Sequence, residues 1–427
     1  MQLLRSRLEQ AHPIGLAAFA IFAAFTAYFS MYAFRKPFAA GFFDEEVYGV
    51  HLKIALVLSQ LVGYSLSKFI GIRLVSELPR PWRSRTLLGL IAIAELALIA
   101  FAWLPPTGKI VAIFFNGLPL GAVWGLVFSF LEGRRNSEIL GAGLSTSYIV
   151  ASGAVKSVGA WILQSGFSES AMPALTGALF WIPFIFAVWL LHCLPPPSQA
   201  DEAARTTRNT MNRQERKSFF WKYAPGLISL TVLYVLLTGY RDMRDNFSAE
   251  IFREVGIDHS SVFATSETWI AIIVLASLAA IYRISDNHRA FFVIHLLMIF
   301  GSAGIGIATL LFQWEIIGGL AWMIGVGSGL YLAYVPYGCV LFDRLIATQR
   351  SIATAVFMIY VTDAFGYVGS IGVLLYKDFG QSAVSWLDFF VQFSYLTSAV
   401  AIVGFISSWL YFSHQHFQPN KNSAPSE

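Results

Sequence analysis

The chain carries little charge for its length. Only 13% of its 427 residues are Asp, Glu, Lys or Arg, whereas 56% are apolar and 15% are aromatic. Soluble domains typically contain about 25% charged residues, so this composition leaves too little polar surface for a protein that faces water on all sides. It also excludes a disordered chain, a fibre and a soluble multidomain enzyme. We therefore predict a membrane protein.

Cysteine is equally scarce. Cys193 and Cys339 both lie in apolar runs, which gives neither a disulfide framework nor metal-ligand spacing. None of the eight histidines has the helical spacing of a zinc site, and no serine lies in a nucleophile elbow. We expect no metal, no cofactor and no enzymatic activity. The net charge of +4 comes from scattered loop arginines and is too dilute for nucleic acid.

Long apolar runs dominate what is present. A membrane-spanning helix needs about 20 mostly apolar residues. Twelve stretches meet this requirement, at residues 13–43, 50–75, 86–104, 109–131, 139–165, 173–194, 223–250, 259–282, 290–312, 314–342, 350–376 and 385–412. The first is too long for a cleavable signal peptide and lacks a cleavage site. The sequence thus predicts an all-α protein with twelve transmembrane helices.

The distribution of basic residues predicts the orientation in the membrane. Of the 29 lysines and arginines, 19 lie in the N-terminus, the C-terminus and the loops after even-numbered spans, and 4 lie in the opposite loops. Because basic loops stay cytoplasmic, we expect a multi-pass protein of the cell membrane with both termini in the cytoplasm.

The longest polar connection divides the spans six and six. It covers residues 195–222 and carries six basic residues against three acids, which is typical of a solvated cytoplasmic linker. We predict a six-helix bundle at 1–194, this linker, and a second bundle with a short tail at 223–427, related by an axis along the membrane normal. We expect a monomer in the lipid bilayer.

Pairs of small residues within spans predict close helix packing. They are Gly121 and Gly125, Gly301 and Gly304, and Gly325 and Gly329.

Charged residues at membrane depth are costly, so each is a candidate functional residue. Arg35 lies late in the first span, and a helix places Tyr28 and Tyr32 on the same stripe. Arg241 holds the corresponding place in the seventh span. Its stripe consists of Tyr234, Thr238, Arg241 and Asp245.

Two arginines at similar depth in the first helix of each bundle indicate an anion site. Guanidinium is planar and permanently charged, which suits bidentate capture of phosphate or carboxylate. The competing interpretation for Arg241 is that acidic neighbours in its own helix neutralise it. Lys36 and Arg244 point away from these stripes, which favours a structural role or a place at the cavity mouth.

Two further ionisable residues lie in the fifth helix of each half. Lys156 and Asp363 are at similar depths, which leaves three interpretations open: a structural ion pair, a gate that breaks between states, or a proton-coupling site at Asp363. In the second span Lys68 shares a face with Gln60 and Tyr64, where it lines the cavity or extends to the interface.

Three stretches carry a resemblance to a known family: Tyr32–Ala39, with its tyrosine-x-x-arginine-lysine-x-phenylalanine pattern, Gly63–Ile70 at the end of the second span, and Phe365–Gly369 in the eleventh. Together with the twelve spans, they resemble the major facilitator superfamily, and in particular its organophosphate/phosphate antiporter branch of glycerol-3-phosphate and hexose-phosphate transporters. The resemblance implies that Arg35 and Arg241 grip a phosphate, that Lys68 lies along the cytoplasmic part of the cavity, and that Glu267 takes the place of an acid in the eighth span.

The sequence also departs from that branch. Gly71–Glu77 replaces its usual loop between spans 2 and 3, and the fifth span has no histidine, so that Lys156 is the nearest cationic residue. The exact substrate therefore does not follow from the resemblance.

These features favour a secondary transporter of a small organic anion. By the resemblance, the anion is phosphorylated and inorganic phosphate is its counter-substrate. The alternative is a sensor on a transporter scaffold, which binds an anion and signals to a partner. The short linker and the short polar tail offer little surface for such an output.

Overall fold

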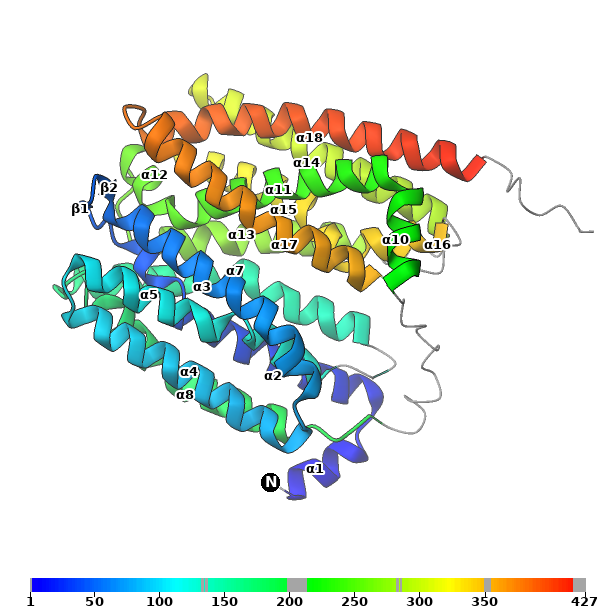
Figure 1. The fold of residues 1–427 in the computed structure, drawn as a ribbon, viewed down its shortest axis with the longest axis horizontal. Coiled ribbons are helices and arrows are strands. Elements are labelled where there is room, and N and C mark those ends of the chain that lie inside the picture. Colours follow the sequence, from blue (N-terminus) through cyan, green and yellow to red (C-terminus); the bar gives the residue numbers. More distant parts are fainter. Residues whose placement is uncertain are drawn as a thin grey trace, which may run out of the picture. The chain divides into compact units, whose positions relative to one another are not determined.

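The computed structural model describes residues 2–131, 134, 137–197, 213–281, 284, 286–348 and 355–417. Within these residues it confirms an all-α architecture (Figure 1). The first half contains α1 (Gln2–Glu9), α2 (Pro13–Met31), α3 (Leu52–Glu77), α4 (Arg80–Trp103), α5 (Pro106–Leu120), α6 (Val123–Ser129), α7 (Ser137–Gln164) and α8 (Met172–Cys193). The second contains α10 (Arg213–Lys222), α11 (Ala224–Asn246), α12 (Ser248–Glu254), α13 (Val262–Ile281), α14 (Asn287–Gln313), α15 (Gly319–Cys339), α16 (Leu341–Thr348), α17 (Ala355–Leu375), the short π-helical turn η3 (Tyr376–Gly380) and α18 (Trp386–Phe417).

Nine helices of the described residues are long and apolar enough to cross a membrane. Helices α3, α7 and α17 occupy the other three expected spans. A two-residue hairpin, β1 (Glu46–Val47) and β2 (Val50–His51), was not expected. Its turn residues Tyr48 and Gly49 have φ angles of 54° and 76°, as the tight turns that join antiparallel strands require.

The first and fourth spans are broken, although the sequence predicts one continuous helix for each. After α2 the chain forms two 3-10 turns, η1 (Tyr32–Phe34) and η2 (Pro37–Ala40). Pro37 has no N–H to donate, so the α-helical ladder cannot continue through it. In the fourth span α5 carries Pro119 inside the helix, and α6 follows only after a two-residue interruption.

Parts of the linker and of the tail are helical, a detail that the sequence did not predict. Helix α10 occupies the last ten residues of the linker, and α18 continues five residues past the expected end of the last span at residue 412. Linker residues 198–212 and tail residues 418–427 lie outside the described residues.

Glycines bring neighbouring helices into close contact. A Cβ atom on Gly121 would lie 2.5 Å from the Tyr64 carbonyl oxygen, and one on Gly301 would lie 2.6 Å from the Gly329 carbonyl oxygen. The predicted packing role of these three glycines is thereby confirmed. In the α3–α5 contact, a Cβ atom on Gly117 would lie 2.5 Å from the carbonyl oxygen of Gln60. Helices α3 and α5 therefore pack backbone against backbone.

This contact predicts a large effect for Gly117→Ala. The added methyl group meets a backbone oxygen that cannot move without separating α3 from α5, so we expect a loss of about 1–3 kcal/mol in stability, as for other overpacked sites. Gly89→Ala in α4 is the matched control, because its Cβ atom would meet nothing within 4 Å. Thermal unfolding in detergent, followed by tryptophan fluorescence, should show a lower midpoint for Gly117→Ala only. Equal midpoints for the two variants would contradict the close packing.

The chain forms two compact units, and within the described residues their boundaries fall inside α11, α13, α17 and α18. Unit 1 consists of Met1–Thr207, Asp242–Ile272 and Ile371–Phe390, and unit 2 consists of Arg208–Arg241, Ile273–Ser370 and Val391–Glu427. Unit 1 thus combines the whole first half with two segments of the second. In it α12 packs against η2, and α7 packs against α2, η1 and η2. The division into two six-helix bundles stays a prediction.

Candidate functional site

In unit 1, Arg35 lies within the break of the first span, between the turns η1 and η2. Its side chain is 7% exposed, and its guanidinium carbon lies 3.8 Å from the centre of the Tyr64 ring. The Tyr32 ring is more distant, at 6.0 Å. A cation at this distance from a ring face is attracted by the ring quadrupole, so Tyr64 holds the arginine in place.

The other predicted residues of the first half gather around this contact. Tyr28 and Tyr32 are buried and meet edge to face, with ring centres 5.6 Å apart. The Lys68 ammonium lies 5.3 Å from the centre of the Tyr64 ring. The structure therefore brings together two cations and three tyrosines within unit 1.

In unit 2, Arg241 is part of a chain of polar contacts. Its guanidinium donates a hydrogen bond to the Tyr334 hydroxyl and lies 4.8 Å from the centre of that ring. The Tyr334 and Tyr234 hydroxyls are 2.7 Å apart, and Tyr234 donates to the Asp363 carboxylate at 3.4 Å. The two rings stack with centres 4.9 Å apart. Two phenols thus connect an arginine to a carboxylate.

Thr238 occupies a different environment from its predicted stripe partners. It is 1% exposed, and its hydroxyl donates to the Tyr234 carbonyl within α11. A Cβ atom on Gly366 would lie 2.9 Å from this hydroxyl, and one on Gly369 would meet the Val235 carbonyl. The glycines of the Phe365–Gly369 stretch therefore serve the packing of α17 on α11, and Thr238 lies in that contact.

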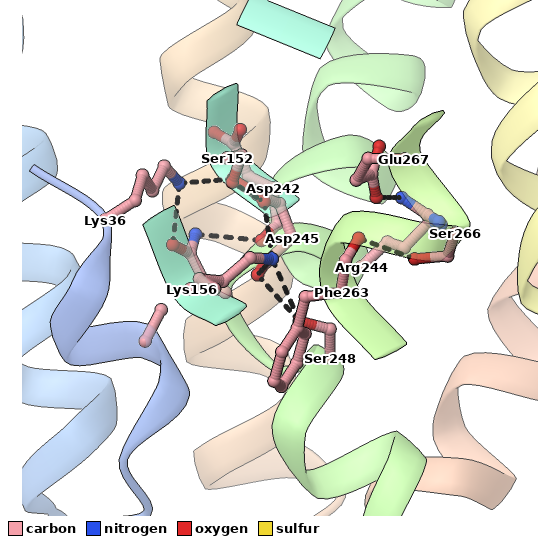
Figure 2. Close-up of polar contacts among 12 residues, drawn as sticks. Lys36, Ser152, Lys156, Asp242, Arg244, Asp245, Ser248, Phe263, Ser266 and Glu267 are labelled. Carbon is pink, nitrogen blue, oxygen red and sulfur yellow. Dashed lines mark hydrogen bonds and ion pairs between the residues drawn. The ribbon is translucent and has the colours of Figure 1, made fainter. Parts of the chain in front are cut away.

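A buried ion cluster in unit 1 surrounds Asp245 (Figure 2). The Lys36 ammonium is 2.5 Å from one carboxylate oxygen of Asp245, and the Lys156 ammonium is 2.9 Å from the other. Ser152 donates a hydrogen bond to the same carboxylate. Lys156 also donates to the Asp245 carbonyl at 2.8 Å and to the Ser248 hydroxyl at 3.0 Å. In this structure, the partner of Lys156 is therefore Asp245, in contrast to the pairing with Asp363 considered from the sequence.

Two more buried ion pairs lie in the same unit. Arg244 donates to Glu267 at 2.6 Å, and Lys53 pairs with Glu250. Glu267, which by the family resemblance takes the place of an acid in the eighth span, thus accepts a hydrogen bond from an arginine. Breaking such a pair leaves a buried charge without compensation, which makes each of them costly to disrupt. The cluster and the Lys53–Glu250 pair link the first half of the chain to residues 245–250, and the Arg244–Glu267 pair joins α11 to α13.

Three contributors were missed as site residues at the level of the sequence. Tyr64 and Tyr334 carry the arginine contacts, and Asp245 carries the cluster. The signal for Tyr64 was its place one turn before Lys68. Tyr334 is one of three tyrosines in the tenth span, with Tyr331 and Tyr337, and the sequence does not distinguish a role in packing from a place in the cavity wall. The spacing of Asp245 from Arg241 suggested a pair within one helix, which obscured its role.

Solved structures of secondary transporters share this fold. A D-xylose–proton symporter has a TM-score of 0.66 at 11% identity, over 94% of this chain and 98% of its own. The xylose transporter XylE from E. coli, inward open, has a TM-score of 0.63 at 11% identity, over 96% and 98%. A bacterial homologue of the human lysosomal transporter Spinster has a TM-score of 0.61 at 11% identity, over 96% and 100%. The molecule is a multi-pass membrane protein with the fold of the major facilitator superfamily.

The chain belongs to a family of unknown function, DUF5690, whose model matches residues 37–415. No curated protein matches the sequence.

Proposed function

We propose that the protein is a secondary transporter of a small organic anion of the phosphorylated class, with Arg35 and Arg241 as the two groups that bind the anion. One observation carries the proposal: the first helix of each half presents one arginine whose guanidinium lies against a tyrosine ring, Tyr64 in unit 1 and Tyr334 in unit 2. This correspondence is what a site shared by two related halves requires.

The chemistry of these contacts supports an anionic cargo. A ring contact engages the face of a guanidinium, whereas a phosphate is gripped by the N–H edge. Tyrosine can therefore orient an arginine and leave the N–H edge of the guanidinium available to a bidentate ligand. Lys68, close to the Tyr64 ring, adds a second positive charge to the site in unit 1.

The Asp245 cluster supports alternating access. It joins Lys36 and Lys156 of the first half to an acid of the second half inside one compact unit. By the orientation predicted from the sequence, this cluster closes the outer side of the protein and breaks when that side opens. Exchange against inorganic phosphate needs no residue to titrate. Symport with protons requires a carboxylate to change charge, and Asp363 and Glu267 are the candidates.

The proposal is tested by reconstitution in liposomes loaded with inorganic phosphate. We expect these vesicles to take up labelled phosphate from an external trace, and external glycerol 3-phosphate to compete with the label. A preset pH gradient separates the coupling modes: exchange proceeds equally in its absence, whereas symport depends on it. Uptake no greater than in empty liposomes would contradict the proposal, and phosphate binding without uptake would indicate the sensor.

A further inference from the structure

Two buried amide side chains lie at the break that contains Arg35. Gln60 of α3 is 4% exposed and Asn116 of α5 is 0% exposed. Both are polar groups in the interior of unit 1, where an unsatisfied donor is costly. The hydrogen bonds of Gln60 and Asn116 therefore indicate their structural role.

The break takes the carbonyls of Phe34 and Arg35 out of the α-helical ladder, because the ladder stops at Pro37, whose missing N–H would face the Ala33 carbonyl. The Lys36 N–H still bonds to the Tyr32 carbonyl at 2.9 Å, but the next residue is Pro37, which has no N–H. The N–H of Ala39 bonds to the Lys36 carbonyl at 3.0 Å rather than to that of Arg35. In a membrane, carbonyls released in this way have to be satisfied by other protein groups.

The two amides supply the missing donors. Asn116 donates to the Phe34 carbonyl at 2.8 Å, and Gln60 donates to the Arg35 carbonyl at 3.0 Å. Asn116 directs its second N–H to the Ala94 carbonyl at 3.0 Å, and Gln60 directs its second N–H to the Asn116 amide oxygen at 2.8 Å. An amide has two N–H donors, so all four donors of the pair have a partner.

The close approach of α3 and α5 makes this arrangement possible. Gly117, next to Asn116, faces the backbone of Gln60, and Gly63 faces the Phe114 carbonyl. With a side chain at either glycine the helices would separate, and the two amides would no longer reach each other. The packing of α3 on α5 thus fixes the backbone of the first span at Phe34 and Arg35.

We infer that Gln60 and Asn116 are positioning residues for Arg35: they hold the carbonyls of Phe34 and Arg35 and thereby fix the direction in which the guanidinium points. Neither amide needs to touch a ligand for this role. The expected effect of these amides on anion affinity rests on the proposed function. Their effect on the position of residue 35 does not depend on it.

The first experiment measures the position of residue 35 without reference to transport. The chain has two cysteines, so Cys193→Ser and Cys339→Ser give a background in which Arg35→Cys is the single thiol. Its rate of reaction with 2-sulfonatoethyl methanethiosulfonate is compared with and without Gln60→Met or Asn116→Leu, which keep the approximate shape but remove the donors. Releasing a carbonyl from one buried hydrogen bond should loosen the segment and raise the rate about tenfold. Thr176→Val is the matched control, because this buried hydroxyl bonds within its own helix.

The second experiment measures phosphate exchange with Arg35 in place. Gln60→Met should raise the KM for phosphate about tenfold, because a misdirected guanidinium binds less tightly, while the maximal rate stays within twofold. Gln60→Asn keeps an amide but withdraws it by one methylene group, and it should give an intermediate KM. If Gln60→Met does not fold, Gln60→Asn is compared with the wild-type protein instead.

The two readouts separate the possible failures. If the wild-type protein does not exchange phosphate, the proposed function is wrong, but the labelling rates still test the position of residue 35. If labelling in both amide variants stays within twofold of the parent rate, the positioning role is overturned. Equal losses of maximal rate in the amide variants and in Thr176→Val, with KM unchanged, would also overturn it.

Discussion

Arg35→Lys and Arg241→Lys are each expected to lower phosphate uptake about 100-fold, because lysine keeps the charge but loses the bidentate fork. A hydrogen bond to a charged group contributes about 1.5–3 kcal/mol, and 1.4 kcal/mol corresponds to a factor of about ten. Loss of one such bond, together with the ring contact that holds each guanidinium, accounts for this size of effect. The measurement is the initial rate of labelled phosphate uptake into phosphate-loaded liposomes, at equal amounts of inserted protein.

Arg289→Lys provides the matched control, because this arginine is exposed at the start of α14. It should transport at the wild-type rate. Normal uptake by both Arg35→Lys and Arg241→Lys would show that the cargo is bound elsewhere, and normal uptake by one of them would restrict the anion site to a single unit.

Asp245→Asn should cause the largest loss of stability among single substitutions of the ion cluster. One carboxylate compensates two buried ammonium groups, those of Lys36 and Lys156. Removing one partner of a buried ion pair costs about 3–5 kcal/mol, because the charge left behind is not compensated. Lys156→Met leaves a neutral pair of Lys36 with Asp245, so its cost should not exceed about 2 kcal/mol. Unfolding by SDS titration in mixed micelles measures both.

The asymmetry between these two variants is the informative result. Asp388→Asn, in the exposed first turn of α18, controls for the loss of a negative charge and should change stability by less than about 1 kcal/mol. If Lys156→Met is as damaging as Asp245→Asn, the two lysines do not share one carboxylate. Under the proposed function, Lys156→Met should in addition shift the protein towards the state in which the cluster is broken.

The candidate arginines could be predicted from the sequence because a charge inside an apolar run is rare and has a physical cost. Arg35 and Arg241 stand out for this reason, and the helical period placed tyrosines on their stripes. Their closest ring partners, Tyr64 and Tyr334, lie on other helices, 29 and 93 residues away in the chain. No periodicity within one helix indicates such contacts.

The breaks in the spans and the pairing of charges were the harder features. Hydropathy measures how long a stretch remains apolar, and it does not depend on whether the backbone stays helical. For this reason the sequence predicted Tyr32–Ala40 as the end of one continuous helix. Lys156 had a suitable acid at similar depth in Asp363, but the acid that it contacts lies at the end of α11. Which carboxylate reaches a buried lysine depends on where each helix ends, and helix ends are what sequence patterns define least well.

One border between the two units passes between the consecutive residues Arg241 and Asp242, near the end of an uninterrupted helix. No loop or hinge separates them, so unit membership of the last turn of α11 follows from what its side chains touch. Asp245 is the residue of this turn that forms salt bridges with the first half of the chain, to Lys36 and Lys156. One continuous helix therefore belongs to both units.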